Sequence, residues 1–335
     1  MSLVQSSLKH IAIQFLRALP GAANKIYQED VLKAIRGIVC YNQGKLAIYT
    51  FQANEKHKKL KNKVREIESF TRQISDEDIE KLNELCDALS KYLDKEFRVI
   101  AEKNFEYLID FFKSRCNPGK RVRVCIKAVE KGNLITLWRD RYYGIPQKPY
   151  PITNSTAFSK IIDTGSYYLC NNIPKSIIEH KYNNLRIHED SVRRFYQCWN
   201  PFRNIKYRRS AKFDEDWQRC WRRIPSNGRD ELPAPETCYK STLVIPMTLL
   251  NDSSLMSDEF RQQFNVRPNA KKAVFGFLGL DHPNVDFFKE EDDVNLCYIF
   301  ADILSLYLIQ RLNYITFSAA FKEAQQIIQR SKSHA

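Results

Sequence analysis

The chain has 335 residues, enough for two ordinary domains, and its 43% hydrophobic and 27% charged residues are typical of a globular protein. Its 53 Lys and Arg against 39 Asp and Glu give a net charge of +14, which favours nucleic acid, anionic lipid or acidic ligands as partners. No stretch without a charged residue or His exceeds 11 residues, which is too short to cross a membrane as a helix, and we expect a cytoplasmic protein without a secretory leader.

Nine cysteines are scattered along the chain without a CxxC pair, and an odd number cannot all be joined in disulfides. This pattern predicts free thiols and neither a disulfide framework nor a zinc ribbon. His180 and His188 stand eight residues apart among acidic residues, but no second ligand pair follows at helical spacing. We therefore expect no metal site and no cofactor.

The first 116 residues are predicted to be helical. Apolar residues recur at helical spacing from Leu3 to Leu19, and Ser75 followed by Asp78 is typical of a capping box that opens a long helix. Apolar residues then follow at spacings of three and four, at Ile79, Leu82, Cys86, Leu89, Leu93, Phe97 and Ile100. Such a stripe must be buried, and we expect it to form a dimer or partner interface.

Asn117-Pro118-Gly119 ends this region, and beyond it the apolar period changes to two residues. This predicts a strand over Val122–Val129 with charged Arg123 and Lys127 on one face, followed by a hairpin turn at Lys131-Gly132-Asn133. Further strands are expected at Leu134–Trp138, Tyr167–Cys170, Thr242–Met247 and Ala273–Leu280. Helices are expected at Asn154–Ile162 and after Phe288.

This order of elements predicts an α+β protein, because strands enclosed by helices at both ends form an antiparallel sheet rather than a doubly wound one. We expect an N-terminal helical region at 1–116, a sheet domain at 120–318 with an insertion at about 175–237, and a helical tail at 319–335.

Three segments of the second half follow the order of a known family. They read IDTGSYYLCNNIP at 162–174, STLVIPM at 241–247 and FGFLGLD at 275–281. Asp281-His282, Phe288 and Asp292-Asp293 then stand where many members have Asn-Lys, Phe and Asp-Glu. In these segments the chain resembles a GAF domain, a small-molecule-sensing fold related to the PAS fold, over residues of about 122–311.

The resemblance implies an antiparallel sheet with a ligand held between one face and the loops and short helices that cover it, and terminal helices that pair in a dimer. By position, the residues that border such a pocket are Trp138, Tyr168, Cys170, Trp199 and Thr242. The alternative is that these aromatic residues fill the core. In the family a cation after the strand pairs with a carboxylate of the next helix, and His282 in its place predicts a weaker, pH-sensitive pair.

The insertion is strongly basic and aromatic. Within residues 191–229, 11 cations accompany only three acids, and eight aromatic residues are interleaved, among them three of the four tryptophans. Arginine binds phosphate or carboxylate in a fork, while Trp and Tyr stack on bases. One interpretation is a lid that binds an anionic ligand through Arg193, Arg194 and Arg222. The others are a nucleic-acid surface that also uses Arg208, Arg209 and Arg223, and a helical insert with buried tryptophans.

No GxxxxGK[ST], GxGxxG, GxSxG or HExxH motif occurs, so P-loop nucleotide hydrolysis is excluded. Some GAF-like proteins reduce methionine sulfoxide with pocket cysteines, and Cys170, Cys198 and Cys238 are the candidates for this minor hypothesis. We expect a protein that is not an enzyme: a sensor or signalling regulator that binds a small anionic or nucleotide-like ligand and acts through a homodimer or partner protein. The alternative function is a nucleic-acid-binding regulator.

Overall fold

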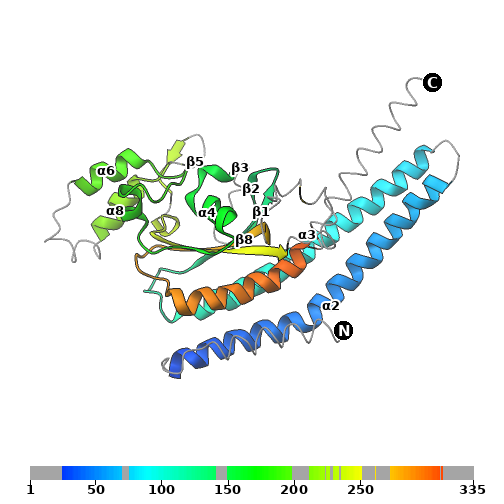
Figure 1. The fold of residues 1–335 in the computed structure, drawn as a ribbon, viewed down its shortest axis with the longest axis horizontal. Coiled ribbons are helices and arrows are strands. Elements are labelled where there is room, and N and C mark those ends of the chain that lie inside the picture. Colours follow the sequence, from blue (N-terminus) through cyan, green and yellow to red (C-terminus); the bar gives the residue numbers. More distant parts are fainter. Residues whose placement is uncertain are drawn as a thin grey trace, which may run out of the picture. The chain divides into compact units, whose positions relative to one another are not determined.

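The computed structural model describes residues 25–69, 75–140, 149–197, 211–222, 224–226, 229–233, 235–250, 261, 272–309 and 311. The predicted helix at Leu3–Leu19 and the predicted tail at 319–335 lie outside these residues. The described chain forms two compact units, one made of the residues up to Asn104 and from Asp302 onward, the other of Phe105–Ala301. Both boundaries fall inside helices, namely α3 (Asp76–Lys113) and the helix at residues 290–309, drawn in orange in Figure 1.

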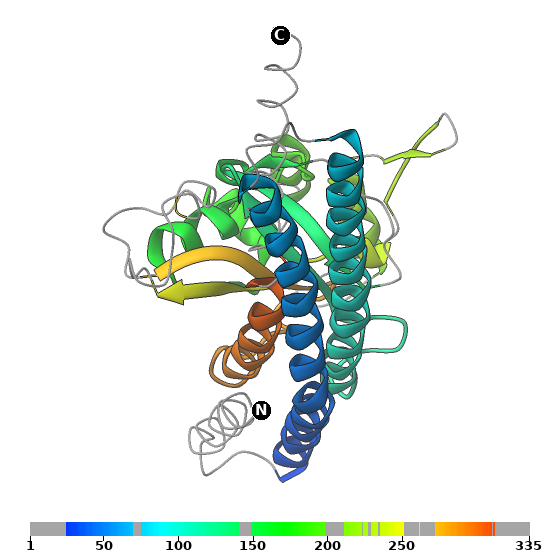
Figure 2. The ribbon, with the colours of Figure 1, turned by 90° about the vertical axis from the view of Figure 1, so that its right-hand side faces the viewer.

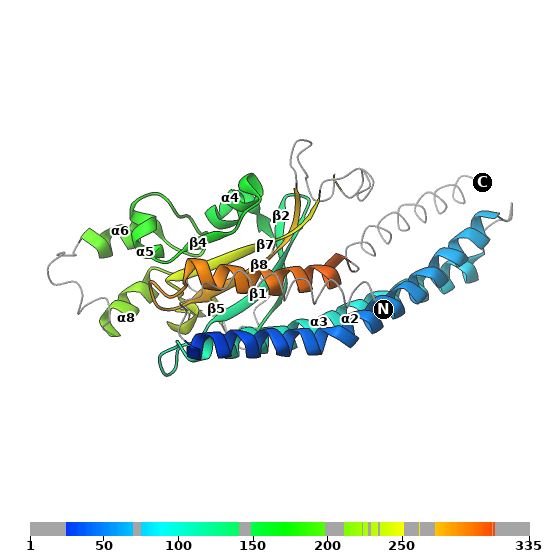
Figure 3. The ribbon, with the colours of Figure 1, turned by 60° about the horizontal axis from the view of Figure 1, so that its bottom comes forward.

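The first unit contains α2 (Lys25–Ser69) and most of α3, which lie side by side and antiparallel (Figure 2, Figure 3). The predicted capping box opens α3, because the backbone N–H of Asp78 donates to Ser75 Oγ (3.2 Å) and the Ser75 hydroxyl donates to Asp78 Oδ2 (2.8 Å). At the same end of the helix pair, Lys63 Nζ lies 3.1 Å from the Asp78 carboxylate.

The predicted apolar stripe of α3 is buried within this unit. Leu82, Leu89, Leu93, Phe97 and Ile100 are each at most 4% exposed. The buried residues of α2 include Ile35, Ile38, Leu46, Tyr49, Ala53 and Leu60. A stripe that is covered within a single chain no longer requires a dimer to bury it, so this reason for the predicted interface falls away.

A buried polar network lies in the middle of the helix pair. Asn42 Nδ2 donates to Asn104 Oδ1 (2.8 Å), and the Tyr307 hydroxyl donates to Asn42 Oδ1 (2.8 Å). Each amide also donates to a carbonyl of its own helix, at Ile38 and Ile100 respectively. Because each amide finds its partner in only one alignment, the network fixes the register of α2 against α3.

The second unit is built on a six-stranded, fully antiparallel sheet of order β3-β2-β1-β8-β7-β4. Its strands are β1 (Arg123–Glu130), β2 (Asn133–Arg139), β3 (Tyr150–Pro151), β4 (Tyr168–Cys170), β7 (Ser241–Leu250) and β8 (Lys272–His282). The predicted hairpin joins β1 to β2: Lys131 (φ 47°) and Gly132 (φ 77°) both take positive φ, as a two-residue loop that follows the strand twist requires.

Helices cover both faces of this sheet. Figure 1 and Figure 2 show α4 (Thr156–Thr164) over one face and the helix segment at residues 290–301 over the other. The chain between β4 and β7 forms α5 (Ile173–Ile178), α6 (Glu189–Gln197), α8 (Ala211–Arg219) and a small hairpin of β5 (Ile224–Ser226) and β6 (Arg229–Glu231). Single turns lie at Ile152–Asn154 and Pro235–Thr237.

The predicted α+β class, with a helical region followed by an antiparallel sheet flanked by helices, is confirmed. Among the helices of the described chain, none combines the length and the apolar character of a membrane span.

The Asn42–Asn104 pair gives a stability prediction. Asn42→Leu removes the acceptor of the Tyr307 hydroxyl and the partner of the buried Asn104 amide on α2, which we expect to lower the free energy of unfolding by about 2–4 kcal/mol. In the double variant Asn42→Leu/Asn104→Leu, neither amide is present to be left without its partner. Its loss in free energy of unfolding should therefore be no larger than that of the single variant. Urea unfolding measures both, with the exposed Asn54→Leu on α2 as control. Additive losses in the double variant would contradict the pairing.

Candidate functional site

The pleat of β1 separates two chemically different faces. Val124 and Ile126 are at most 1% exposed and belong to the apolar face. Arg123, Cys125 and Lys127 alternate with them and belong to the other face. Arg123 is only 8% exposed and Lys127 only 7%, so the charged face is covered as well. Such burial of two cations on a sheet requires compensating groups around them.

A cavity of about 360 Å³ lies on the charged face. Four neighbouring strands form its floor, because strand pairing aligns Cys125 with Arg139 of β2 and Gly279 of β8, and Gly279 with Val244 of β7. The other floor residues are Arg123, Lys127, Thr242 and Asp281. A Cβ at position 279 would lie 3.1 Å from Cys125 Sγ, which is a tight contact. Glycine at this position therefore leaves room for the Cys125 side chain on the floor of the cavity.

Two segments form the walls of the cavity. The first is the amino end of α4 with the residues before it, and the second is the loop at residues 182–186. A bridge between Ser155 and Asn184 joins them, and Asn184 Nδ2 donates to the Tyr239 hydroxyl (2.7 Å). The rings of Tyr150 and Phe158 line the first wall. The amino end of α4 adds the positive end of a helix dipole to the cations of the floor.

Two cations converge on one hydroxyl at the β1–β2 side of the floor. Thr136 Oγ1 accepts from Lys127 Nζ (2.9 Å) and from the Arg139 guanidinium (3.5 Å). Lys127 Nζ also lies 5.2 Å from the ring centre of Tyr150 and 5.7 Å from that of Phe158. Burial lowers the pKa of Lys127, and the nearby Arg139 lowers it further.

Asp281 is the acidic residue of the floor. It pairs in register with Arg123 of β1 and with Thr242 of β7, whose side chain bonds to its carboxyl group. Burial raises the pKa of Asp281, and Arg123 opposes that rise. A second lining carboxylate, on Asp140, lies 2.9 Å from the Arg121 guanidinium, which is not part of the lining. Burial raises the pKa of Asp140 in spite of this pair.

The insertion supplies part of the cavity wall through Arg186. The Arg186 guanidinium lies 5.4 Å from the ring centre of Trp221, and its backbone carbonyl accepts from the N–H of Arg222 (2.8 Å). Burial lowers the pKa of Arg186, and Arg123 and Arg139 lower it further. Three positive groups thus act on one another across this cavity.

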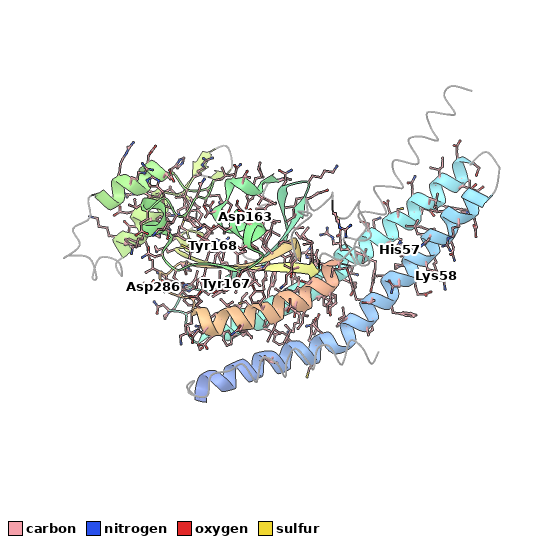
Figure 4. All side chains as sticks on the ribbon, in the orientation of Figure 1. His57, Lys58, Asp163, Tyr167, Tyr168 and Asp286 are labelled. Carbon is pink, nitrogen blue, oxygen red and sulfur yellow. The ribbon has the colours of Figure 1, made fainter. Side chains whose placement is uncertain are left out.

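The predicted pocket residues are divided between different environments. Thr242 and the exposed Arg222 line the cavity. Trp138 pairs with Ile126 and so belongs to the apolar face, because the β1–β2 register shifts at a bulge between Ile126 and Lys127. Tyr168 lies on β4, which Figure 4 shows near Asp163 of α4, and Lys160 Nζ lies 5.5 Å from the Tyr168 ring centre.

Cys170 lies one strand beyond the cavity, in a buried cluster formed by the insertion. The cluster contains Cys170, Ile173, Ile177, Tyr182, Ile187, Val192, Trp217, Cys220, Trp221, Cys238 and Tyr239. Trp217 and Trp221 are at most 1% exposed, and Trp217 Nε1 donates to the carbonyl of Cys238 (3.0 Å). These two indoles stack on protein and present no face to a base.

Of the remaining predicted residues of the insertion, the structure describes two. Arg193 and Arg194 lie on α6 outside the lining, where the Arg193 guanidinium is 3.2 Å from His180 Nδ1. Trp199, Arg208, Arg209, Arg223 and Cys198 lie outside the described residues.

The described cysteines near the cavity are held as thiols. Burial raises the pKa of Cys170 and Cys125, and it raises the pKa of Cys238 to about 11. In the described chain, no group of three His, Cys, Asp or Glu side chains is placed to hold a metal ion.

In the segment after β8 that was expected to pair His282 with a carboxylate, the pair that forms is different. Asp293 pairs with Arg115 (2.7 Å) and accepts from the backbone N–H of Lys289 (2.8 Å), so Arg115 supplies the cation that we expected from His282. His282 is fully buried, its ring centre lies 3.5 Å from that of Phe287, and its Nδ1 accepts from the N–H of Asn284. Phe288 is buried, and Asp292 is half-buried on the same helix as Asp293.

Sequence reasoning did not assign Arg123, Lys127, Arg139 or Arg186 to the cavity. The one available signal was the alternation of Arg123, Cys125 and Lys127, which marks a charged face on a strand that turns out to be central in the sheet. Arg186 follows Ile126 of β1 by 60 residues in the chain. No local sequence pattern indicates that Arg186 folds back over the charged face of this strand.

Comparison with known proteins reveals similarity of structure without similarity of sequence. No family model matches the chain, and no curated protein sequence matches it. A type II free methionine-R-sulfoxide reductase from Thermoplasma acidophilum is 14% identical over 64% of this chain and 94% of its own, with a TM-score of 0.31. The fRMsr of Staphylococcus aureus, solved in complex with its substrate, is 13% identical over 65% of this chain and 95% of its own, with a TM-score of 0.30.

A far-red cyanobacteriochrome photoreceptor is likewise similar, at 12% identity over 56% of this chain and 76% of its own and a TM-score of 0.29. At these TM-scores and identities the likenesses do not assign the chain to a family. The prediction that the chain is not an enzyme needs correction, because two of these similar structures are reductases. The fold gives no ground for excluding catalysis.

The buried His282 gives a pH prediction. Burial, with Lys120, Lys240 and Arg115 nearby, lowers the pKa of His282 from 6.5 to about 3. Between pH 6.5 and about pH 3, His282 is protonated in the unfolded chain and neutral in the folded chain. The free energy of unfolding therefore falls as the pH falls. His282→Gln should remove up to about 1.4 kcal/mol per pH unit of this slope between pH 6 and pH 4.

Urea unfolding across that range measures the slope, with the exposed His188→Gln as the matched control. If His282→Gln and His188→Gln both keep the slope of the unmodified protein, His282 is not held neutral by its surroundings.

Proposed function

We propose that the unit formed by Phe105–Ala301 binds a small anionic molecule in the cavity on its charged face. The observation that carries this proposal is the convergence of Arg123, Lys127, Arg139 and Arg186 on one cavity of about 360 Å³. Cations held together away from water are unfavourable unless a negative group joins them, and an anion seated there gains from a lowered dielectric constant.

The cavity also supports an apolar or aromatic part in the ligand. Tyr150 and Phe158 line one wall, Tyr182 lines the other, and Tyr239 lies beside Asn184. Aromatic walls with a few converging polar groups are typical of small-molecule sites, and the volume lies near the lower end of their usual range of about 300–1,000 Å³. The ligand class is therefore an anion attached to a compact ring.

We further propose a sensing role for the site. The helix that includes residues 290–301 of this unit continues into the other unit, and so does α3. A change in the sheet that reaches either helix is passed along a continuous hydrogen-bonded segment rather than a flexible linker. This continuity supports a regulatory output for ligand binding.

Thermal unfolding tests the binding proposal with pairs of compounds that differ only in charge: benzoate with benzamide, and phenyl phosphate with phenol. At ten times its Kd, an anion should stabilise the protein by about 1.4 kcal/mol, and each kcal/mol should raise the melting temperature by about 2–4 °C. The neutral partners should produce no comparable shift.

Arg139→Gln should lose the response to both anions, because it removes a cation of the floor. Arg65→Gln makes the same change of charge at an exposed position on α2 and should keep it. Equal shifts for charged and neutral partners, or an unchanged response in Arg139→Gln, would refute anion binding in this cavity.

A further inference from the structure

Two arginines of the insertion lie directly opposite each other at the cavity. An antiparallel bridge joins Ile187 to Trp221, so the residues one step further along, Arg186 and Arg222, face each other across the two segments. The backbone N–H of Arg222 donates to the Arg186 carbonyl (2.8 Å). Side chains at such positions point to the same side, with Cβ atoms about 4.5–5.5 Å apart, and both arginines line the cavity.

The backbone that carries this arginine pair is fixed by buried neighbours. Ile187 is 6% exposed and Trp221 is 1% exposed, and both belong to the buried cluster of the insertion. On the other side of the bridge, the N–H of His188 donates to the carbonyl of Cys220 (2.8 Å). The two arginines therefore cannot move apart without breaking this packing, although like charges directly opposite each other are destabilising.

Both guanidinium groups keep their N–H donors available. Within the part of the chain that the structure describes, the side chains of Arg186 and Arg222 form no ion pair and no hydrogen bond. The Trp221 ring supports Arg186 through its face, which does not use the N–H groups at the edge of the guanidinium. Arg186 opposes the rise in the pKa of Asp281, but no ion pair joins these two residues.

Two adjacent guanidinium groups distinguish between kinds of anion. The two oxygens of a carboxylate are matched by the fork of a single arginine. A terminal phosphate offers three oxygens and a charge of about −1.5 to −2 near neutral pH, so it can accept from two arginines at once and neutralise both.

We propose that Arg186 and Arg222 together bind a terminal phosphate group of the ligand. This inference rests on the proposed function and adds to it the anionic group and the residues that hold it. Because both arginines belong to the insertion and Arg222 follows directly on Trp221, the basic aromatic insertion then contributes to ligand recognition.

Calorimetric titration of the full chain at pH 7.5 and constant ionic strength tests the inference with two probes. Phenyl phosphate and benzoate carry the same ring and differ in the anionic group. We expect phenyl phosphate to bind about tenfold more tightly than benzoate, because it engages two guanidinium groups instead of one.

Variants of the pair locate the effect. Arg222→Gln should weaken phenyl phosphate by about tenfold and benzoate by less than about threefold, since one fork remains for the carboxylate. Arg222→Lys keeps the charge without the fork and should recover only part of the loss. Arg186→Gln should weaken phenyl phosphate to the same extent as Arg222→Gln. Arg219→Gln removes the same charge from an exposed position on α8 and should change neither affinity.

The outcomes separate the two proposals. Arg222 is exposed, so its replacement should leave the fold intact, and circular dichroism checks this even if Arg186→Gln fails to fold. If phenyl phosphate binds no better than benzoate, or binds Arg222→Gln as tightly as Arg219→Gln, the phosphate inference is overturned while anion binding in the cavity stands. If neither probe binds the unmodified protein, the proposed function fails together with it.

Discussion

The antiparallel pairing of β1 with β2 on one side and β8 on the other is the constraint on which the second unit depends. A central strand has two covered faces, and the pleat alternates its side chains between them. In β1 this alternation places Val124 and Ile126 in an apolar layer and Arg123 and Lys127 under α4 and the loop at 182–186. Arg123 and Lys127 are largely covered, and the Thr136 hydroxyl and the rings of Tyr150 and Phe158 lie around Lys127. The charged floor of the cavity follows from the position of β1 between β2 and β8 in the sheet.

The insertion belongs to this arrangement rather than to a separate surface. Its cluster around Trp217 and Trp221 excludes water from the region beside β4, and Trp221 then provides the face over which Arg186 lies. Lys120 and the buried Lys240 both pair with Asp214 of α8, which ties the insertion to the first turn after α3 and to the start of β7. A buried lysine requires such a partner, because losing the carboxylate would leave an uncompensated charge. The basic residues of the insertion that the structure describes thus divide between internal pairs, the cavity and exposed positions.

The sequence predicted the features that depend on neighbouring residues. Spacing within a few positions was enough to predict the Ser75–Asp78 cap, the Lys131-Gly132 turn, the strand alternation and, from these, the α+β class. Features that depend on pairing between distant parts of the chain could not be predicted from the sequence. The bulge between Ile126 and Lys127 moves Trp138 to the apolar face, and only the register with β2 reveals it. Arg115 stands 178 residues from Asp293, so a pattern centred on β8 led us to expect His282 as its partner. The apolar stripe of α3 was recognised correctly, but the helix that covers it was within the same chain.

The energetics of the cavity connect binding with stability. Two like charges about 4 Å apart repel by about 4 kcal/mol at an effective dielectric constant of about 20, and a whole domain is stable by about 5–15 kcal/mol. Repulsion between cations that line one cavity is therefore large on the scale of domain stability, and Thr136 and the rings of Tyr150 and Phe158 lie where they offset part of it at Lys127. Under the proposed function, an anion bound among these cations would stabilise the folded unit. On the opposite face of the same sheet, the helix segment at residues 290–301 continues beyond Ala301 into the other unit (Figure 1). The proposed sensing role depends on this continuity of the helix.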